Sequence, residues 1–273
     1  RDWSSDVCSS DLVLTQKGRG YEPAMRHPAR FHGAGPFDVK TGLPVGKSNP
    51  TYTDVFSTVM RKMGDRRKDV AAVTAAMMTG VGLKRFSNMF PDRCFDVGIA
   101  EEHAVTFAAA LSLGGITPVV AIYSSFLQRA YDQIMHDVCM QNLHVVFAID
   151  RAGLVGYDGE THHGIFDLSY LGSMPNMTIL SPATLDQLEY MLDFAINKFN
   201  APIAIRYPRG GTEAENVPSA FTLGQAQCIQ NGSDVTIIAT GRMVKRAEEV
   251  AKLTTKSVEI LAMPTIKPAV WEV

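Results

Sequence analysis

Cysteine and tryptophan are scarce in this chain. Only four of its 273 residues are cysteine and two are tryptophan. Cys94, Cys139 and Cys228 are far apart and lack the spacing of metal ligands, so a cysteine-based metal centre and a disulfide framework are both excluded. Such sparse cysteine is typical of a reducing compartment, and we therefore expect a cytoplasmic protein.

An excess of one charge sign is also missing. The formal net charge is −2, and the 46% hydrophobic and 20% charged content is typical of a globular protein. This balance gives no support for nucleic acid or an acidic membrane surface as a partner. The one long uncharged run, residues 104–123, is interrupted by Gly114-Gly115 and Pro118, so it predicts a buried helix, a turn and a strand rather than a membrane span.

The N-terminal part of the chain differs from the rest in composition and periodicity. Residues 1–12, RDWSSDVCSSDL, have no periodicity, and one choice of codons for them resembles a sequencing-library adapter. We therefore expect this segment to be an assembly artefact and disordered. Residues 13–50 are rich in Gly, Pro, Lys and Arg, and we interpret them as the end of a missing N-terminal domain followed by a linker.

From Thr51 onward, short apolar strands alternate with amphipathic helices. This alternation predicts an α/β fold with a doubly wound, mostly parallel sheet over residues 51–220. Residues 221–273 begin another α/β unit and are interpreted as its truncated start. The expected strands are 69–77, 93–100, 117–123, 143–149, 177–182, 201–208, 235–241 and 257–263, and the expected helices are 52–64, one beginning at 101, 125–141, 184–199 and 243–253.

Polar and aromatic clusters follow several of these strands. In open α/β sheets, ligands bind beyond the carboxyl ends of the strands, so clusters at those ends are expected to meet in one crevice. The clusters are GIAEEH (98–103), YSSF (123–126), DRAG (150–153) and RYPRGG (206–211).

The first cluster places ionisable groups where an apparently buried strand, ending at residues 97–100, passes into an apolar helix. Glu102 is explained by the general preference for acids at helix N-termini. For Glu101, directly after the strand, a functional role is the better interpretation. In the next segment Phe126 suits either a site or the core, whereas Tyr131 is expected to be a core aromatic.

The loop after residue 150 is glycine-rich, polar and long. It carries Arg151, Asp158, Glu160, His162 and His163, and such a loop between strands is more often functional than a plain connector. No further ligands fall at a suitable spacing, so no metal site is predicted in this chain. Two further arginines, Arg206 and Arg209, lie beside glycines and suit a phosphate, with a solvated surface turn as the alternative.

Four segments taken together resemble a known family. They are 95–115, 123–141, 147–170 and 206–211, and they are similar to the 1-deoxy-D-xylulose-5-phosphate synthases, which are transketolase-like thiamine-diphosphate enzymes. The resemblance covers residues 13–268. It implies a pyrimidine-binding domain at 51–220 and the start of a transketolase C-terminal domain at 221–273.

The resemblance also implies an activity. The full-length enzyme, a homodimer, would condense pyruvate with D-glyceraldehyde 3-phosphate to give 1-deoxy-D-xylulose 5-phosphate and CO2. This product serves the formation of isoprenoid precursors, thiamine and pyridoxal.

The same resemblance implies roles around the cofactor. Glu101 would hydrogen-bond the pyrimidine of thiamine diphosphate and so help to remove the C2 proton of the cofactor. Ile99 would hold the cofactor in its bent shape and Phe126 would stack on the pyrimidine. Tyr21 matches a cofactor-contacting tyrosine, and His32 matches a histidine that lines the active site.

A second set of residues falls at positions that line the acceptor pocket. Arg151 and Arg209 would bind the phosphate of the acceptor, and His162 would serve in proton transfer. Tyr123 and Asp158 line the same pocket.

The sequence also departs from the family. The Gly-Asp-Gly motif and later Asn that hold Mg²⁺ and the diphosphate are absent, so the Mg²⁺ ligands are expected in a missing N-terminal domain. The chain alone is therefore expected to be inactive. Two alternatives stay open: another transketolase-like enzyme, such as transketolase or an oxo-acid dehydrogenase β subunit, and a non-catalytic cofactor-binding or dimerisation module.

Overall fold

The computed structural model describes residues 15–28, 30–46, 49–211 and 214–269. The predicted artefact at residues 1–12 lies outside the described residues. The chain divides into two compact units, Arg1–Ser48 and Asn49–Val273, and each is described by itself.

The first unit is a loop-rich segment with one short helix, α1 (Glu22–Arg26). Its centre is a cluster of aromatic rings in which Tyr21 and Phe37 each lie edge-on to Phe31, with centroid separations of 5.5 and 5.1 Å. The Tyr21 hydroxyl donates to the carbonyl of Val39 at 2.8 Å. Because α1 has only five residues, these side-chain contacts, rather than regular secondary structure, stabilise the segment.

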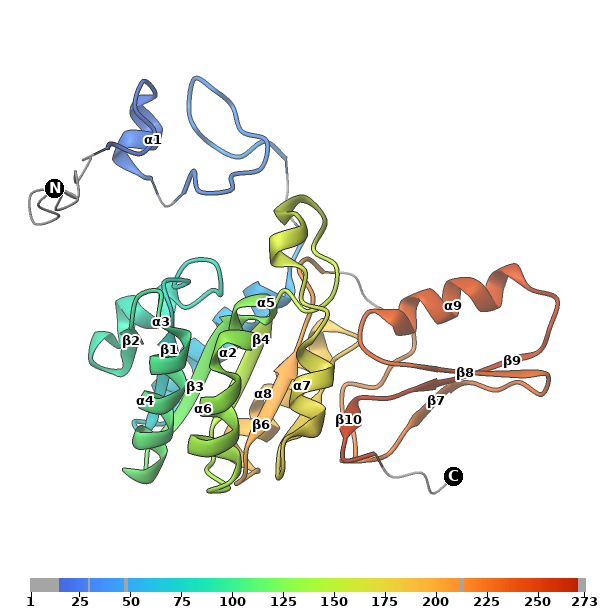
Figure 1. The fold of residues 1–273 in the computed structure, drawn as a ribbon. Helices are drawn as coiled ribbons and strands as arrows, with labels where there is room; N and C mark the ends of the chain where they lie inside the picture. The colour runs from blue at the N-terminus through green and yellow to red at the C-terminus, as the bar shows by residue number, and fades with distance from the viewer. Residues whose placement is uncertain (1–14, 29, 47–48, 212–213, 270–273) are drawn as a thin grey trace, which may run out of the picture. The chain divides into compact units, whose positions relative to one another are not determined.

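The second unit is built on a seven-stranded sheet (Figure 1). The strand order is β10-β5-β6-β4-β3-β1-β2, and every neighbouring pair is parallel except β10 with β5. This confirms the predicted doubly wound, mostly parallel α/β fold. The strands are β1 (Val70–Thr74), β2 (Cys94–Asp96), β3 (Thr117–Tyr123), β4 (Val146–Asp150), β5 (Thr178–Leu180), β6 (Ile203–Arg206) and β10 (Thr265–Lys267).

Helices cover both faces of this sheet (Figure 1). Helices α2 (Tyr52–Arg66) and α8 (Leu185–Asn197) pack together on one face, and α4 (Glu101–Leu113), α6 (Tyr131–Gln133) and α7 (Asp167–Ser173) lie on the other. Because both faces are covered, β1 and β4 are buried along their whole length, which explains their continuous apolar sequences. The small helix α3 (Lys84–Met89) packs beside α2.

The uncharged run at residues 104–123 has the predicted form. Helix α4 ends at Leu113, Gly115 takes a positive φ of 81°, and the chain enters β3 at Thr117. Within the described ranges, no helix is both long and apolar enough to cross a membrane.

Three details of the prediction are wrong. The strand predicted at 93–100 ends at Asp96, because the Asp96 carboxylate accepts from the backbone of Gly98 and Ala76 and closes a turn. Ile99, expected in a buried run, is 79% exposed. Tyr131, expected in the core, is 39% exposed, and its ring lies edge-on to Tyr170 rather than among the buried residues.

The helix expected at residues 125–141 differs as well, because it is divided into four segments. These are α5 (Ser124–Leu127), the 3₁₀ turn η3 (Gln128–Ala130), α6 and the π-helical η4 (Ile134–Cys139). Neither glycine nor proline marks the breaks, so residue propensities alone do not encode them. π-helical turns of this kind are frequent near functional sites.

A second, three-stranded sheet follows in the same unit. Its order is β7-β9-β8, with β8 (Val235–Ala239) and β9 (Val258–Ala262) parallel and joined by α9 (Met243–Leu253). The added strand β7 (Gln227–Gln230) was not predicted, whereas the helix at 243–253 is confirmed. After β9 the chain returns to the large sheet as its edge strand β10.

Candidate active site

A cleft of about 660 Å³ opens at the carboxyl ends of the central strands. Its walls come from the N-terminus of α2, the loops after β1, β4 and β6, and the turn before α9. The cleft is lined by Thr51, Thr53, Asp54, Gly80, Arg151, Leu154, Val155, Gly156, Arg209, Gly210 and Arg242.

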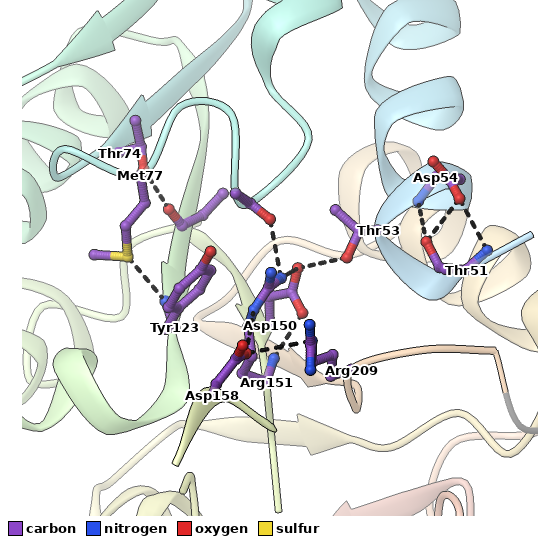
Figure 2. A network of polar contacts seen from close by, with 12 residues as sticks. Thr51, Thr53, Asp54, Thr74, Met77, Tyr123, Asp150, Arg151, Asp158 and Arg209 are labelled. Atoms are coloured by element: carbon purple, nitrogen blue, oxygen red, sulfur yellow. Dashed lines mark hydrogen bonds and ion pairs between the residues drawn. The ribbon is translucent and has the colours of Figure 1, made fainter. Parts of the chain in front are cut away.

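Arg151 is held tightly at the end of β4 (Figure 2). The buried carboxylate of Asp150 accepts from the Arg151 backbone N–H at 2.6 Å and from its guanidinium at 2.8 Å. The Thr53 hydroxyl donates to the same carboxylate at 2.8 Å. Burial raises the pKa of Asp150, although the Arg151 charge and these hydrogen bonds act in the opposite direction. The fixed guanidinium also donates to the carbonyl of Gly80 at 2.9 Å.

Arg209, after β6, is joined to Arg151 through one carboxylate. The Asp158 Oδ2 atom lies 3.3 Å from Arg209 Nε and 3.8 Å from Arg151 Nε. Arg151 Nε is buried and has no hydrogen-bond acceptor in the described part of the chain. Two guanidinium groups that share one carboxylate leave positive charge in excess, which favours an anionic ligand in this cleft.

Tyr123 lies beneath the Arg151 guanidinium. The guanidinium carbon is 4.2 Å from the Tyr123 ring centroid, and Phe126 stacks beside the same ring at 5.8 Å. The pKa of Tyr123 is raised chiefly by burial. His162 lies edge-on to Phe126 at 5.2 Å, and its Nδ1 is 3.0 Å from the Thr161 hydroxyl.

Glu101 is the first residue of α4 and is buried, with only 2% of its side chain exposed. The exposed Glu102 beside it shows that helix-end preference alone does not explain this burial. The two Glu101 carboxylate oxygens lie 3.3 and 3.5 Å from the Arg129 guanidinium, which in turn lies 6.0 Å from the Phe126 ring. The carboxyl group therefore retains hydrogen-bonding capacity for a ligand.

A continuous series of side-chain contacts joins this carboxyl group to the cleft. It runs through Glu101, Arg129, Phe126, Tyr123, Arg151, Asp158 and Arg209. One end offers a buried carboxyl group beside an aromatic ring, and the other end offers two guanidinium groups. Such an arrangement suits a ligand pair with a heteroaromatic ring at one end and a phosphate at the other.

Four predicted site residues are not part of this group. Tyr21 and His32 belong to the first unit, which is described by itself and in which His32 contacts Lys17. Arg206 does not line the cleft, because its guanidinium is paired with the buried Asp167 at 2.9 Å. His163 accepts a backbone hydrogen bond from Val155 at 3.1 Å and so holds the loop rather than facing a ligand.

Several residues of the site, among them Asp150, Thr53, Gly80 and Arg242, were missed from the sequence. Asp150 was quoted only as part of DRAG, although an acid at a buried strand end beside an arginine could have singled it out. Thr53, Gly80 and Arg242 carry no sequence signal of their own, because only the fold brings them to the cleft. Across the described ranges, no three His, Cys, Asp or Glu side chains are grouped to hold a metal ion.

Residues 48–213 match the model of the transketolase pyrimidine binding domain, and residues 224–273 match that of the transketolase C-terminal domain. The chain belongs to the transketolase family through its pyrimidine-binding domain. The helix that begins with Glu101, and the cleft residues Arg151 and Arg209, therefore lie within the part of the chain that matches the transketolase pyrimidine-binding domain.

Curated relatives give a narrower likeness. The chain is 52% identical over 262 residues to the 1-deoxy-D-xylulose-5-phosphate synthase of Pelotomaculum thermopropionicum, covering 94% of this chain and 40% of that protein. It is 54% identical over 244 residues to the synthase of Syntrophomonas wolfei, covering 88% and 38%. The chain thus spans about two fifths of the length of these relatives.

Solved structures share the fold. A split-gene transketolase, described as an inactive β4 tetramer, superposes with a TM-score of 0.70 at 27% identity, covering 81% of this chain and 73% of that one. The transketolase of Leishmania mexicana superposes with a TM-score of 0.72 at 18% identity, covering 90% and 39%. The latter likeness concerns the fold alone.

Proposed function

We propose that this chain is the pyrimidine-binding and acceptor-binding part of a 1-deoxy-D-xylulose-5-phosphate synthase. The whole protein would condense pyruvate with D-glyceraldehyde 3-phosphate to 1-deoxy-D-xylulose 5-phosphate and CO2, with uptake of one proton by the aldehyde oxygen. The observation that carries the proposal is the Arg151–Asp158–Arg209 group, which side-chain contacts connect to the buried Glu101. The 52% identity to a curated synthase supports this choice among transketolase-like reactions.

The residues at the Glu101 end fit thiamine diphosphate. When bound, this cofactor supplies a nucleophilic carbon that takes up the acyl part of pyruvate. Glu101, almost excluded from water and paired with Arg129, would share a proton with the pyrimidine ring. Phe126 would stack on that ring, and Ile99 is exposed enough to pack against the cofactor.

Other cofactor contacts in the proposal involve residues of the first unit. Tyr21 would contact the cofactor and His32 would line the site, both from the first unit. The Mg²⁺ ion that binds the diphosphate would take its ligands from an N-terminal domain rather than from this chain.

The residues at the arginine end would bind the acceptor. Arg151 and Arg209, which both line the cleft, would hold its phosphate through their guanidinium groups. Asp158 would hold both guanidinium groups in position through its ion pairs, and the Tyr123 ring would pack against the guanidinium of Arg151. His162 would deliver the proton to the aldehyde oxygen.

We also propose the wider organisation. Residues 1–12 are an artefact, 13–50 end an N-terminal domain, 51–220 form the pyrimidine-binding domain and 221–273 begin the C-terminal domain. The whole protein is a cytoplasmic homodimer. Size-exclusion chromatography with light scattering tests the oligomer, and titration of this chain with thiamine diphosphate, with and without Mg²⁺, tests whether it binds the cofactor alone.

A product assay tests the proposed reaction. The whole protein is supplied with ¹³C-labelled pyruvate and D-glyceraldehyde 3-phosphate, and carbon NMR follows the label. We expect labelled 1-deoxy-D-xylulose 5-phosphate and CO2. Formation of sedoheptulose 7-phosphate from pentose phosphates, with no product from pyruvate, would instead identify a transketolase and overturn the proposal.

A further inference from the structure

A third arginine, Arg242, lines the same cleft as Arg151 and Arg209. It is far from both in sequence, in the turn between β8 and α9, and is partly buried. The arginines of the pyrimidine-binding domain are therefore joined at the cleft by one from the segment that matches the transketolase C-terminal domain.

The turn that carries Arg242 is fixed on two sides. Gly241 has a φ of +54°, and a Cβ built there would lie 2.5 Å from the Ser181 hydroxyl, so only glycine lets the turn lie against the end of β5. On the other side, the Thr240 hydroxyl donates to the carbonyl of Met263 at 2.7 Å. The position of Arg242 at the cleft is thus built into the fold.

The loop after β4 brings Arg242 and Arg209 together. Arg242 donates to the carbonyl of Leu154 at 3.2 Å, and Arg209 donates to the next carbonyl, that of Val155, at 3.4 Å. Two guanidinium groups from distant segments therefore bind consecutive carbonyls of one loop. A ligand that reaches Arg209 along this loop also comes close to Arg242.

The three guanidinium groups differ in their counter-charges. Arg151 is paired with Asp150 and both Arg151 and Arg209 with Asp158, but no carboxylate of the described residues lies within 4.0 Å of the Arg242 guanidinium. Its one described polar contact is a neutral carbonyl, which uses a single one of five N–H donors. An uncompensated guanidinium that lines a cleft is a strong binding group for an anion.

We infer that Arg242 is a specificity-determining residue that binds the phosphate of the acceptor together with Arg151 and Arg209. This inference rests on the proposed function. The phosphate group of the acceptor has three terminal oxygens, and each of them accepts hydrogen bonds. It can therefore bind three guanidinium groups at the same time. Arg242 thereby makes recognition of the phosphorylated acceptor depend on the C-terminal segment.

Kinetics of the whole protein test this role. In Arg242→Gln the KM for D-glyceraldehyde 3-phosphate should rise by about tenfold, because a hydrogen bond to a charged group is lost. The KM for pyruvate and the rate with unphosphorylated glyceraldehyde should change little. Arg242→Lys should recover only part of the affinity, since lysine lacks the paired donors. The matched control is Arg246→Gln on α9, where the arginine is exposed and paired with Glu249.

A binding measurement separates this inference from the proposed function. Calorimetric titration of the whole protein with inorganic phosphate should show binding by wild type and Arg246→Gln, and about tenfold weaker binding by Arg242→Gln. If wild type forms 1-deoxy-D-xylulose 5-phosphate but Arg242→Gln keeps both the wild-type KM for D-glyceraldehyde 3-phosphate and the wild-type phosphate affinity, the inference is wrong and the proposed function stands.

The opposite result is also informative. If phosphate binding depends on Arg242 but no 1-deoxy-D-xylulose 5-phosphate forms, the proposed function is wrong and Arg242 remains a phosphate ligand. If Arg242→Gln fails to fold, Arg242→Lys is measured in its place. A wild-type KM for D-glyceraldehyde 3-phosphate together with a wild-type phosphate affinity in Arg242→Lys would then overturn the inference.

Discussion

Asp150 and Arg151, neighbours in sequence, form a closed pair in which one carboxylate accepts both the backbone N–H and the guanidinium of the next residue. The pair requires Arg151 to adopt a left-handed φ of 58°. This conformation turns the arginine back over the end of β4 and beneath the loop that carries Gly80. The geometry of the cleft thus depends on an acid that does not itself line it.

Replacing Asp150 with asparagine should therefore destabilise the protein strongly. Removal of one partner from a buried ion pair leaves the other charge uncompensated and costs about 3 kcal/mol of unfolding free energy. Urea unfolding measures the effect. Asp65→Asn is the matched control, since Asp65 pairs with Arg61 at 3.2 Å on the exposed side of α2 and its loss should cost about 0.5 kcal/mol. Equal losses in the two variants would show that Asp150 is not a structural counter-charge.

Glu101→Gln should nearly abolish turnover of the whole protein. The substitution keeps the shape of the side chain but removes its ability to share a proton, which typically costs about 10²-fold or more in rate. Among the described residues, the only polar partner of the Glu101 carboxylate is the half-exposed Arg129, and glutamine has nearly the same shape, so the fold should be preserved. Steady-state rates are compared with those of Glu102→Gln, whose glutamate is exposed one residue further on. Turnover of Glu101→Gln within a few-fold of the control would remove Glu101 from the mechanism.

Gly80→Ala should disturb the acceptor end of the site. A Cβ at Gly80 would overlap the Tyr123 hydroxyl and push this ring away from Arg151. Overpacking of this kind destabilises by about 1–3 kcal/mol. In the double variant Gly80→Ala with Tyr123→Phe the overlap with the hydroxyl is removed and only a tight contact with the ring carbon at 3.0 Å remains, so much of the stability lost in the single variant should return.

The control for this prediction is Gly172→Ala. Gly172 is in helix α7 and a Cβ there meets no atom within 4 Å, so this variant should be neutral or more stable. Thermal unfolding of all three variants provides the comparison. If Gly80→Ala behaves like Gly172→Ala, the Gly80–Tyr123 contact does not constrain the site.

His144 should make stability fall in mildly acidic solution. Burial, with the nearby Arg67 charge, lowers the pKa of His144 below its ordinary value of 6.5, while its hydrogen bond to the carbonyl of Ala195 at 2.8 Å acts in the opposite direction. The unfolded chain then binds a proton more readily than the folded one as the pH falls below about 6.5, so the free energy of unfolding decreases. Urea unfolding at pH values on both sides of about 6.5 measures this slope. The same slope in His144→Gln would show that another group is responsible.

The sequence predicts the large sheet well and the site only in part. Uninterrupted apolar strands between amphipathic helices are enough to predict a doubly wound sheet, and residues at strand ends, such as Arg151 and Arg209, follow from it. The turn at Gly98 depends instead on hydrogen bonds to Asp96, one of them from the distant Ala76, and no residue type in 124–139 marks where that segment divides. Arg242 could not be predicted as a cleft residue, because it is far from Arg151 and Arg209 in sequence and only the fold brings it to the cleft.

The claim that the cleft binds the phosphate of the acceptor is tested most directly by Arg209→Lys. A lysine keeps the charge but cannot reproduce the paired donors of the guanidinium. We predict that the KM for D-glyceraldehyde 3-phosphate rises by about tenfold while the KM for pyruvate stays nearly constant. The ratio of kcat/KM for D-glyceraldehyde 3-phosphate to that for unphosphorylated glyceraldehyde should fall by the same factor. An equal loss for the phosphorylated and unphosphorylated aldehydes would contradict the account, because Arg209 would then only stabilise the turn at residues 207–211.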